Sequence, residues 1–279
     1  MKKISRRSFL AAAGLSVAAL ALTACGGSAS SVASSVASSA SSAAASTSAA
    51  AGELTTVEAG KLTMATNAAF PPYEMTTDAG EFEGIDIETA QAIADKLGLE
   101  LQIDDMDFDA ALLSVQQGKA DIVMAGVTVT DERKAVMDFS DSYATGIQSI
   151  IVPEGSDIAS PDDLADKKIG TQRGTTGYIY CSDDFGDDNV VAYDDGLTAV
   201  QALNNGQVDA VVIDNAPAKE FVAANPGLVI LETSYAEEDY AIGMAKGNTA
   251  LEDAVNAALE ELKADGTLQS IVDKYITAE

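Results

Sequence analysis

The feature that most constrains the fold is an internal repeat of a helix–glycine–strand pattern. Residues 111–123 and 199–211 share apolar, Gly and Asp positions at one constant offset, so that Gly118 matches Gly206. A pattern of this length, found twice, predicts two similar α/β units. The alignment also places Gly126 opposite Asp214, each at the carboxyl end of an expected strand, where open α/β sheets bind ligands. We therefore expect two lobes that hold a ligand between their strand ends.

Hydrophobic periodicity predicts strands alternating with helices along both units. Strands are expected at residues 62–66, 84–87, 99–103, 122–127, 147–152, 168–171, 190–193, 210–213 and 240–245. Apolar helical faces are expected at 90–97, 108–115, 197–204 and 251–262, followed by a short helix through Ile271. A further helix should begin at Ser160-Pro161. This alternation indicates a mainly parallel sheet with right-handed crossovers.

Arg133 is the unusual residue of the stretch that follows the strand at 122–127. Thr130 is expected to cap a helix, which places Arg133 in its first turn, where the helix dipole opposes a cation. Two interpretations are open. Arg133 could form an anion site with Thr128 and free backbone N–H groups, or it could be an exposed arginine paired with a nearby acid.

Composition limits the possible functions. The 279 residues suffice for two α/β domains, and the absence of histidine and tryptophan excludes His-based triads and His metal sites. Removing the four unopposed basic residues before Cys25 takes the formal charge from −28 to −32, which argues against a nucleic-acid partner. Cys25 and Cys181 lie far apart, so we expect no disulfide, and nothing predicts a metal or another cofactor.

The first 52 residues indicate export and anchoring rather than folding. Residues 1–24 have the basic start, apolar stretch and small residues of a signal peptide. Arg6-Arg7 resembles a twin-arginine signal, although a general secretory signal can also carry such a pair. Residues 22–26 resemble a bacterial lipobox, which implies cleavage before Cys25 and lipidation of its thiol. Residues 25–52 then form a Ser/Ala-rich tether that cannot bury enough apolar surface to fold.

The remaining polar residues at the expected strand ends match an α-amino acid. Arg133, Thr128 and the N–H groups of Thr175 and Thr176 suit a carboxylate. Asp214 suits an ammonium group.

The Gly126 carbonyl and the Asn67 side chain can accept from the same ammonium group, and Phe70 and Phe108 could enclose the rest of the ligand. Simpler roles also fit: Asp214 could cap a strand end, and the two Phe residues could belong to the core.

An acidic run at Glu74, Asp78 and Glu81 could bind a basic side chain, although such runs are usually solvated.

Several short motifs resemble the polar amino-acid branch of the extracellular solute-binding proteins, family 3, which serve ABC importers. They are residues 65–73 (ATNxxFxPY), 84–86 (GID), 106–108 (MDF), 125–133 (AGxTxTxxR), 139–143 (FSDxY), 174–176 (GTT) and 212–214 (VID), where x marks a position that is not matched. The resemblance implies the periplasmic-binding-protein type II fold, with two Rossmann-like α/β lobes joined by a two-strand hinge. It implies lobe 1 at residues 53–147 plus 243–279 and lobe 2 at residues 148–242.

The same resemblance assigns roles to the ligand-contacting residues. Arg133, Thr128 and the Thr176 backbone would hold the α-carboxylate, and Asp214 with the Gly126 carbonyl would hold the α-amino group. Phe70 and Phe108 would pack on the ligand side chain. This chain differs from many relatives in having Asn67 in place of Asp, and in having Ile213 and Gln172 where some relatives carry polar or charged residues that contact the ligand.

The function implied is a lipid-anchored protein on the outer face of the bacterial cytoplasmic membrane. It would bind a polar or basic free amino acid as a monomer and deliver it to an ABC permease with its ATPase. Two other functions are considered: an enzyme similar to the periplasmic cyclohexadienyl or arogenate dehydratases, and a sensory module that reports to a receptor. The absence of His and of any Glu within the matched cleft motifs argues against the enzyme. The sequence leaves the identity of the amino acid open.

Overall fold

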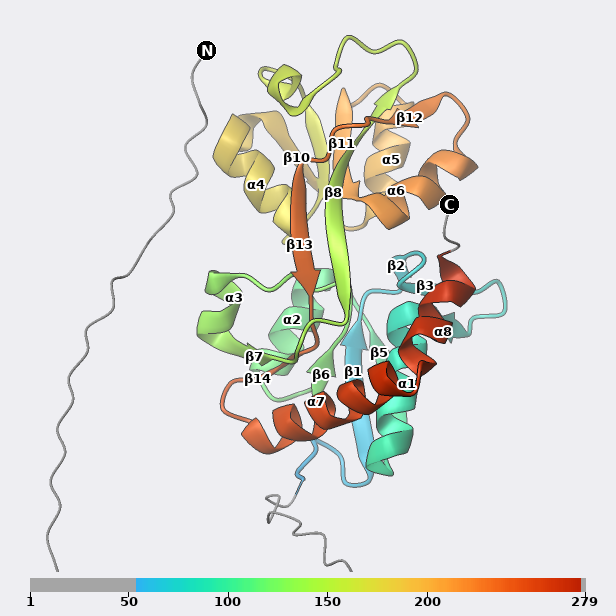
Figure 1. Ribbon diagram of the computed structural model, residues 1–279. Coiled ribbons are helices and arrows are strands. Elements are labelled where there is room, and N and C mark those ends of the chain that lie inside the picture. The colour runs from blue at the N-terminus through green and yellow to red at the C-terminus, as the bar shows by residue number, and fades with distance from the viewer. Residues whose placement is uncertain (1–53, 277–279) are drawn as a thin grey trace, which may run out of the picture. The chain divides into compact units, whose positions relative to one another are not determined.

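The computed structural model describes residues 54–276, whose elements form two lobes, each with its own sheet (Figure 1). The expected signal peptide, lipidated Cys25 and tether lie outside the described residues. Within 54–276, every helix is too short or too polar to cross a membrane.

The first lobe is built on a five-stranded sheet in the order β5-β1-β6-β14-β7. These strands span Glu100–Asp105, Lys61–Thr66, Ile122–Val123, Gly243–Ala245 and Met137–Phe139. Strand β1 pairs in parallel with β5 and β6, whereas β14 pairs antiparallel with β6 and β7. A small antiparallel sheet of β2 (Ala69–Phe70), β3 (Glu74–Thr76) and β4 (Phe82–Glu83) belongs to the same lobe.

Helices bury the apolar side chains of the first lobe in two clusters. One cluster joins the sheet to α1 (Ile85–Leu97), α7 (Thr249–Ala264) and α8 (Thr267–Tyr275). The other joins it to α2 (Phe108–Gln116). Helix α3 (Asp131–Val136) follows the short strand β6 and carries the cap predicted from the sequence, since the Thr130 side chain accepts from the Arg133 N–H.

The second lobe is built on a mixed sheet in the order β10-β9-β11-β8-β12. These strands span Val190–Tyr193, Ile169–Gln172, Ala210–Asp214, Ala144–Pro153 and Leu228–Ile230. Helices α5 (Gly196–Asn204) and α6 (Asn215–Ala224) pack in one apolar cluster, and α4 (Thr176–Phe185) packs in another, which includes Cys181. Short 3-10 helices span Pro161–Leu164 and Asp187–Asn189, and the first carries the predicted capping box at Ser160.

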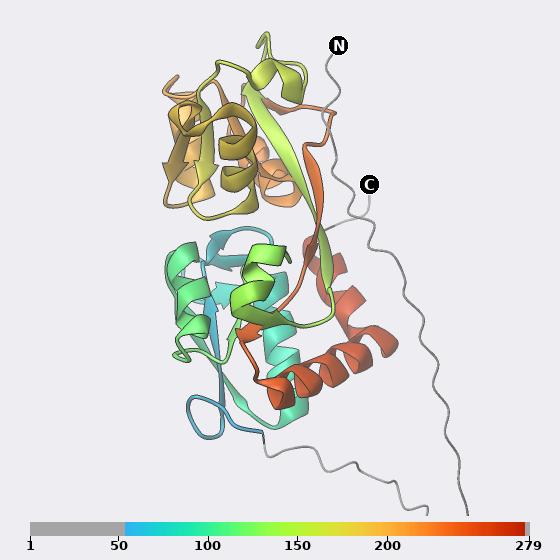
Figure 2. The same ribbon diagram turned by 90° about the vertical axis from the view of Figure 1, so that its left-hand side faces the viewer.

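Two antiparallel strands run between the lobes, as Figures 1 and 2 show. Strand β13 (Ala236–Tyr240) pairs with the first half of β8, whereas the second half of β8 pairs with β11 and β12. Each half of β8 therefore contacts different neighbours. The expected lobe boundary at 147/148 falls within β8, and that at 242/243 falls just after β13; both stay a prediction.

Four expectations about the elements were wrong in detail. Residues 84–87 start α1 instead of forming a strand, because Gly84 adopts φ 132° at the helix N-cap. The strand expected at 122–127 ends at Val123, after which the chain leaves the sheet toward Gly126. The strand expected at 240–245 is divided between β13 and β14. The sheets are mixed rather than mainly parallel, because β8 and β14 enter antiparallel.

Candidate functional site

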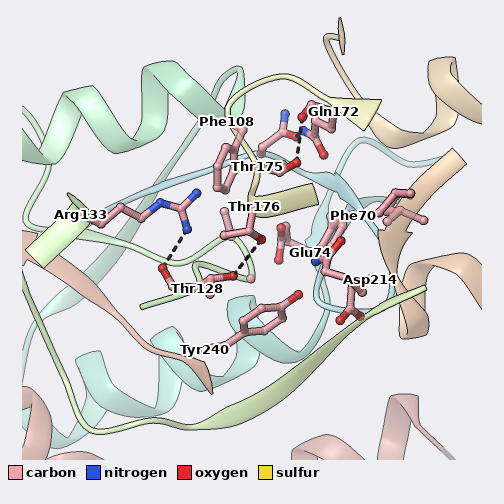
Figure 3. Close-up of a pocket in the computed structure, with 16 residues that line it drawn as sticks. Phe70, Glu74, Phe108, Thr128, Arg133, Gln172, Thr175, Thr176, Asp214 and Tyr240 are labelled. Atoms are coloured by element: carbon pink, nitrogen blue, oxygen red, sulfur yellow. Dashed lines mark hydrogen bonds between the residues drawn. The ribbon is translucent and has the colours of Figure 1, made fainter. Parts of the chain in front are cut away.

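A pocket lies between the two lobes, and all nine residues predicted to contact a ligand line it (Figure 3). The nine are Asn67, Phe70, Phe108, Gly126, Thr128, Arg133, Thr175, Thr176 and Asp214. Seven other residues complete the lining: Glu74, Ala125, Gln148, Gln172, Val212, Ile213 and Tyr240. The strand ends of both lobes therefore meet at one site, as the internal repeat predicted.

Arg133 supplies a buried cation at one end of this pocket. The side chain is 8% exposed, and its guanidinium donates to the Thr128 carbonyl at 2.8 Å and to the Gly174 carbonyl at 3.1 Å. Among residues 54–276, no acidic side chain forms an ion pair with it. Burial lowers the pKa of Arg133, and the Glu238 charge opposes that shift. The interpretation as an exposed, acid-paired arginine was therefore wrong, and the guanidinium is available for an anion.

The first turn of α4 faces the same end of the pocket from the second lobe. Thr175 caps α4 by accepting from the Tyr178 N–H, and Thr176 lies 3.4 Å from Thr128 across the lobes, measured between hydroxyl oxygens. The first N–H groups of a helix have no partner within the helix, and its dipole favours an anion there. Together with Arg133, this turn forms a site suited to a carboxylate.

Asp214 supplies a carboxylate at another side of the pocket, at the end of β11. Its side chain caps α6 by accepting from Ala216 N, and Asp214 also lines the pocket. It also accepts from Ile147 N at 2.7 Å. Burial raises the pKa of Asp214 to about 6, against the hydrogen bonds it accepts. A cationic group that enters the pocket would stabilise its ionised form.

Thr128 connects the pocket to the hinge strand β13. Its hydroxyl donates to Glu238 at 3.0 Å, and the Gln148 side-chain amide donates to the same carboxylate oxygen at 3.0 Å. Glu238 is 7% exposed, so this carboxylate is a buried charge directly behind the pocket wall.

Asn67 is already engaged across the lobes. Its side-chain oxygen accepts from the Gln172 amide at 2.8 Å, and its nitrogen donates to the Met106 carbonyl at 3.0 Å. An ammonium group would therefore share this oxygen with Gln172, which makes the pair a contact between lobes as well as a candidate ligand contact.

The two phenylalanines are both core and lining. Phe108 is buried in an apolar cluster of the first lobe, and its ring lies 5.4 Å from the Arg133 guanidinium carbon. Phe70 is half-buried, stacks on Tyr73 with ring centroids 5.8 Å apart, and contacts apolar clusters of both lobes. Flat apolar walls of this kind suit the aliphatic part of a ligand.

Glu74 is the important residue that was not assigned to the site from sequence. Its side chain is fully buried and lines the pocket, whereas Asp78 and Glu81 of the same acidic run are exposed. The feature that could have assigned Glu74 to the site is its position in a short strand, four residues after Phe70. Tyr240 and Gln148 were also unassigned, because they come from the hinge strands and belong to no matched motif. Glu74 lies outside the matched cleft motifs, so their lack of Glu does not mean that the pocket lacks one.

Comparison with known proteins identifies the relatives of this chain. Residues 62–278 match the model of the bacterial extracellular solute-binding proteins, family 3. A probable histidine-binding protein of Neisseria gonorrhoeae is 33% identical over 275 residues, covering 96% of this chain and 95% of the relative. An L-cystine-binding protein of Escherichia coli is 33% identical over 226 residues, covering 80% and 85%.

Solved structures agree with this result. An ancestral arginine-binding protein bound to arginine is 42% identical, with a TM-score of 0.74, and the match covers 78% of this chain and 98% of that one. The arginine-, lysine- and histidine-binding protein of Geobacillus stearothermophilus is 33% identical, with a TM-score of 0.75, covering 78% and 96%.

Proposed function

The chain belongs to the bacterial extracellular solute-binding proteins of family 3, and on that premise we propose that it binds an L-amino acid for an ABC importer. The observation that carries this proposal is the pairing of a buried guanidinium, Arg133, with a buried carboxylate, Asp214, in one pocket. An α-amino acid carries a carboxylate and an ammonium group on one carbon, and these complement the two charges. The histidine-, cystine- and arginine-binding relatives support the same substrate class.

In this proposal the α-carboxylate binds Arg133, Thr128 and the first turn of α4 at Thr175 and Thr176. The bidentate geometry of Arg suits a carboxylate, and the helix N-terminus adds N–H donors.

The α-ammonium binds Asp214, the Gly126 carbonyl and the Asn67 oxygen, while Phe70 and Phe108 pack on the ligand side chain. The two lobes, 53–147 plus 243–279 and 148–242, close around the ligand by a change in β8 and β13.

Calorimetric titration tests this function directly. The purified protein is stripped of bound ligand by unfolding and refolding, then titrated with the twenty amino acids, ornithine and cystine. We expect saturable one-to-one binding of one or a few, and a loss of at least about a hundredfold in Arg133→Ala, since a buried charge pair is removed. Arg173→Ala, which removes an exposed arginine from the loop before α4, is the matched control. Unchanged affinity in Arg133→Ala would refute the carboxylate assignment.

Lipid anchoring through Cys25 is part of the proposal and rests on residues outside the described structure. The family is extracellular, and a lipid on Cys25 with a Ser/Ala tether would keep the folded part at the outer face of the membrane, where a permease and its ATPase could receive the ligand. Cys25→Ser should release the protein from isolated membranes, whereas Cys181→Ser should not. We also propose that the protein acts as a monomer, which light scattering of the purified chain would test.

A dehydratase-like activity is the second candidate, because Glu74 places a carboxyl with a raised pKa in the pocket. Turnover of prephenate or arogenate that disappears in Glu74→Gln would support it. We propose that the protein is not an enzyme, since the family and its relatives are solute-binding proteins. The expected result is therefore no turnover.

A further inference from the structure

The buried charges around the pocket do not balance. Four carboxyl groups line it or contact its lining, those of Glu74, Asp86, Asp214 and Glu238. One buried cation, Arg133, faces them among residues 54–276. A zwitterionic α-amino group and carboxylate add no net charge, so a neutral amino acid would leave this excess of acid unchanged.

Glu74 is the carboxyl that accepts no hydrogen bond from an N–H or O–H donor among the described residues. Asp86, Asp214 and Glu238 each accept two hydrogen bonds from N–H or O–H donors. Neither oxygen of Glu74 has a donor among the described residues, although the side chain is fully buried. An unpaired buried carboxylate is costly, so this group must bind a proton or a cation.

The position of Glu74 makes it accessible to a ligand. It lies in β3 directly opposite Phe70 in the strand register, and Figure 3 shows its carboxyl among the labelled pocket side chains. Burial raises its pKa well above the usual value, and the neighbouring Asp86 charge adds to the shift. The titratable groups around it are Tyr73, Asp86, Asp105, Tyr143 and Asp214, none of which is a cation. Glu74 and Asp86 share a side-chain hydrogen bond, so a proton held by Glu74 lies between the two carboxyls, and a ligand cation that binds Glu74 would replace it.

We propose that Glu74 selects amino acids with a positively charged side chain, and that its carboxyl releases a proton to solvent when that side chain binds. The proposal rests on the amino-acid-binding function above. It extends that function because Arg133 and Asp214 account for the two charges common to all amino acids. Glu74 is then free to recognise a third charge, that of the ligand side chain.

Arginine and citrulline separate this proposal from its alternatives, because citrulline has nearly the shape of arginine without the charge. The full chain and its Glu74→Gln variant are titrated with both ligands. Glutamine has the shape of the protonated carboxyl, so the variant should fold, and its melting temperature checks this. We expect wild type to prefer arginine by about tenfold to a hundredfold, as for a hydrogen-bonded buried charge. Glu74→Gln should lose that preference and keep its citrulline affinity. Glu83→Gln, an exposed acid on the neighbouring β4, is the control.

Proton release is the second measurement. Titrations at pH 7.5 in buffers of different ionisation enthalpy should show net proton release when wild type binds arginine, and about none when it binds citrulline. An equal loss of affinity for both ligands in Glu74→Gln would overturn the proposal, because Glu74 would then hold the α-ammonium. A preference for arginine that survives the substitution would also overturn it. Binding of neutral amino acids alone would refute this inference but not the proposed function, whereas no binding of any amino acid would refute the function.

Discussion

The affinity for a neutral amino acid should fall when the pH is lowered from 7.5 to 5, because Asp214 must be ionised to hold the α-ammonium. In the ligand-free protein, burial raises the pKa of Asp214 to about 6, from an ordinary value of 3.8. A bound ammonium stabilises the carboxylate and lowers that pKa. The ligand-free protein therefore binds more protons than the complex, and binding weakens as the pH falls through 6.

The size of the effect follows from the fraction of Asp214 that is ionised. At pH 7.5 nearly all of it is ionised, so the dissociation constant is constant above about pH 7. At pH 5, one unit below the pKa, about one molecule in eleven has the ionised carboxyl. The dissociation constant should therefore rise about tenfold, which corresponds to about 1.4 kcal/mol. Citrulline is the suitable ligand because its side chain is uncharged and should not change the protonation of Glu74.

Calorimetry at pH 5, 6 and 7.5 measures this change, and the dependence of the binding enthalpy on buffer at pH 6 should show about half a proton released per ligand. Asp214→Asn should weaken binding and remove the pH dependence. The exposed variant Asp183→Asn, at the surface of α4, should reproduce the wild-type profile. A dissociation constant that is equal at pH 5 and 7.5, without proton release at pH 6, would refute the assignment of Asp214 to the ammonium.

Three further predictions concern stability and closure. The ligand-free protein should melt at a higher temperature at pH 5.5 than at pH 7.5, because its buried carboxyls have raised pKa values and the folded state binds more protons than the unfolded state. A melting temperature that rises with pH in scanning calorimetry would contradict this. Gly174→Ala should cost about as much stability as Gly186→Ala, because both glycines lie at positive φ. It should also lower ligand affinity more than Gly186→Ala does, because its Cβ would lie 1.6 Å from an oxygen of the Asp109 side chain of the other lobe, which must rotate away when the lobes close. Equal affinities of the two variants would show that the lobes need not approach there. Gly84→Ala should lower the free energy of unfolding, measured in urea, by about 3 kcal/mol or more. Gly84 has φ +132°, and a Cβ there would lie 2.2 Å from the backbone carbonyl oxygen of Tyr73. Gly80→Ala, where the Cβ would enter open space, should have a much smaller effect.

The lobes and the pocket could be predicted because their signals are local in sequence. Arg133, Thr128 and Gly126 follow one buried strand within ten residues, and Asp214 ends the equivalent strand of the repeat. Since ligands bind beyond the carboxyl ends of such strands, the repeat predicted that these residues from two lobes, each with its own sheet, face one ligand between them. The structure brings all of them to one pocket.

The parts that sequence reasoning missed depend on contacts between distant segments. Tyr240 and Gln148 reach the pocket only because β8 and β13 pair across about ninety residues of chain. Residues 84–87 alternate apolar and polar side chains like a strand, but Asp86 is fully buried because its carboxylate accepts from the Gly126 N–H, forty residues away. Glu74 looked like a member of a solvated acidic run for the same reason, since its neighbours in space are distant in sequence.

The hydrogen bond between Asn67 and Gln172 joins the lobes without any ligand atom, as does that between Arg133 and Gly174. Such contacts raise the share of ligand-free molecules that already have the lobes together, and the apparent dissociation constant is inversely proportional to that share. A substitution at Gln172 that weakens the contact without altering the rest of the pocket would shift the affinity for every ligand by one common factor. Transport could thus be adapted to scarce or abundant nutrient by changing how readily the empty receptor closes, while the order of preference among amino acids stays the same.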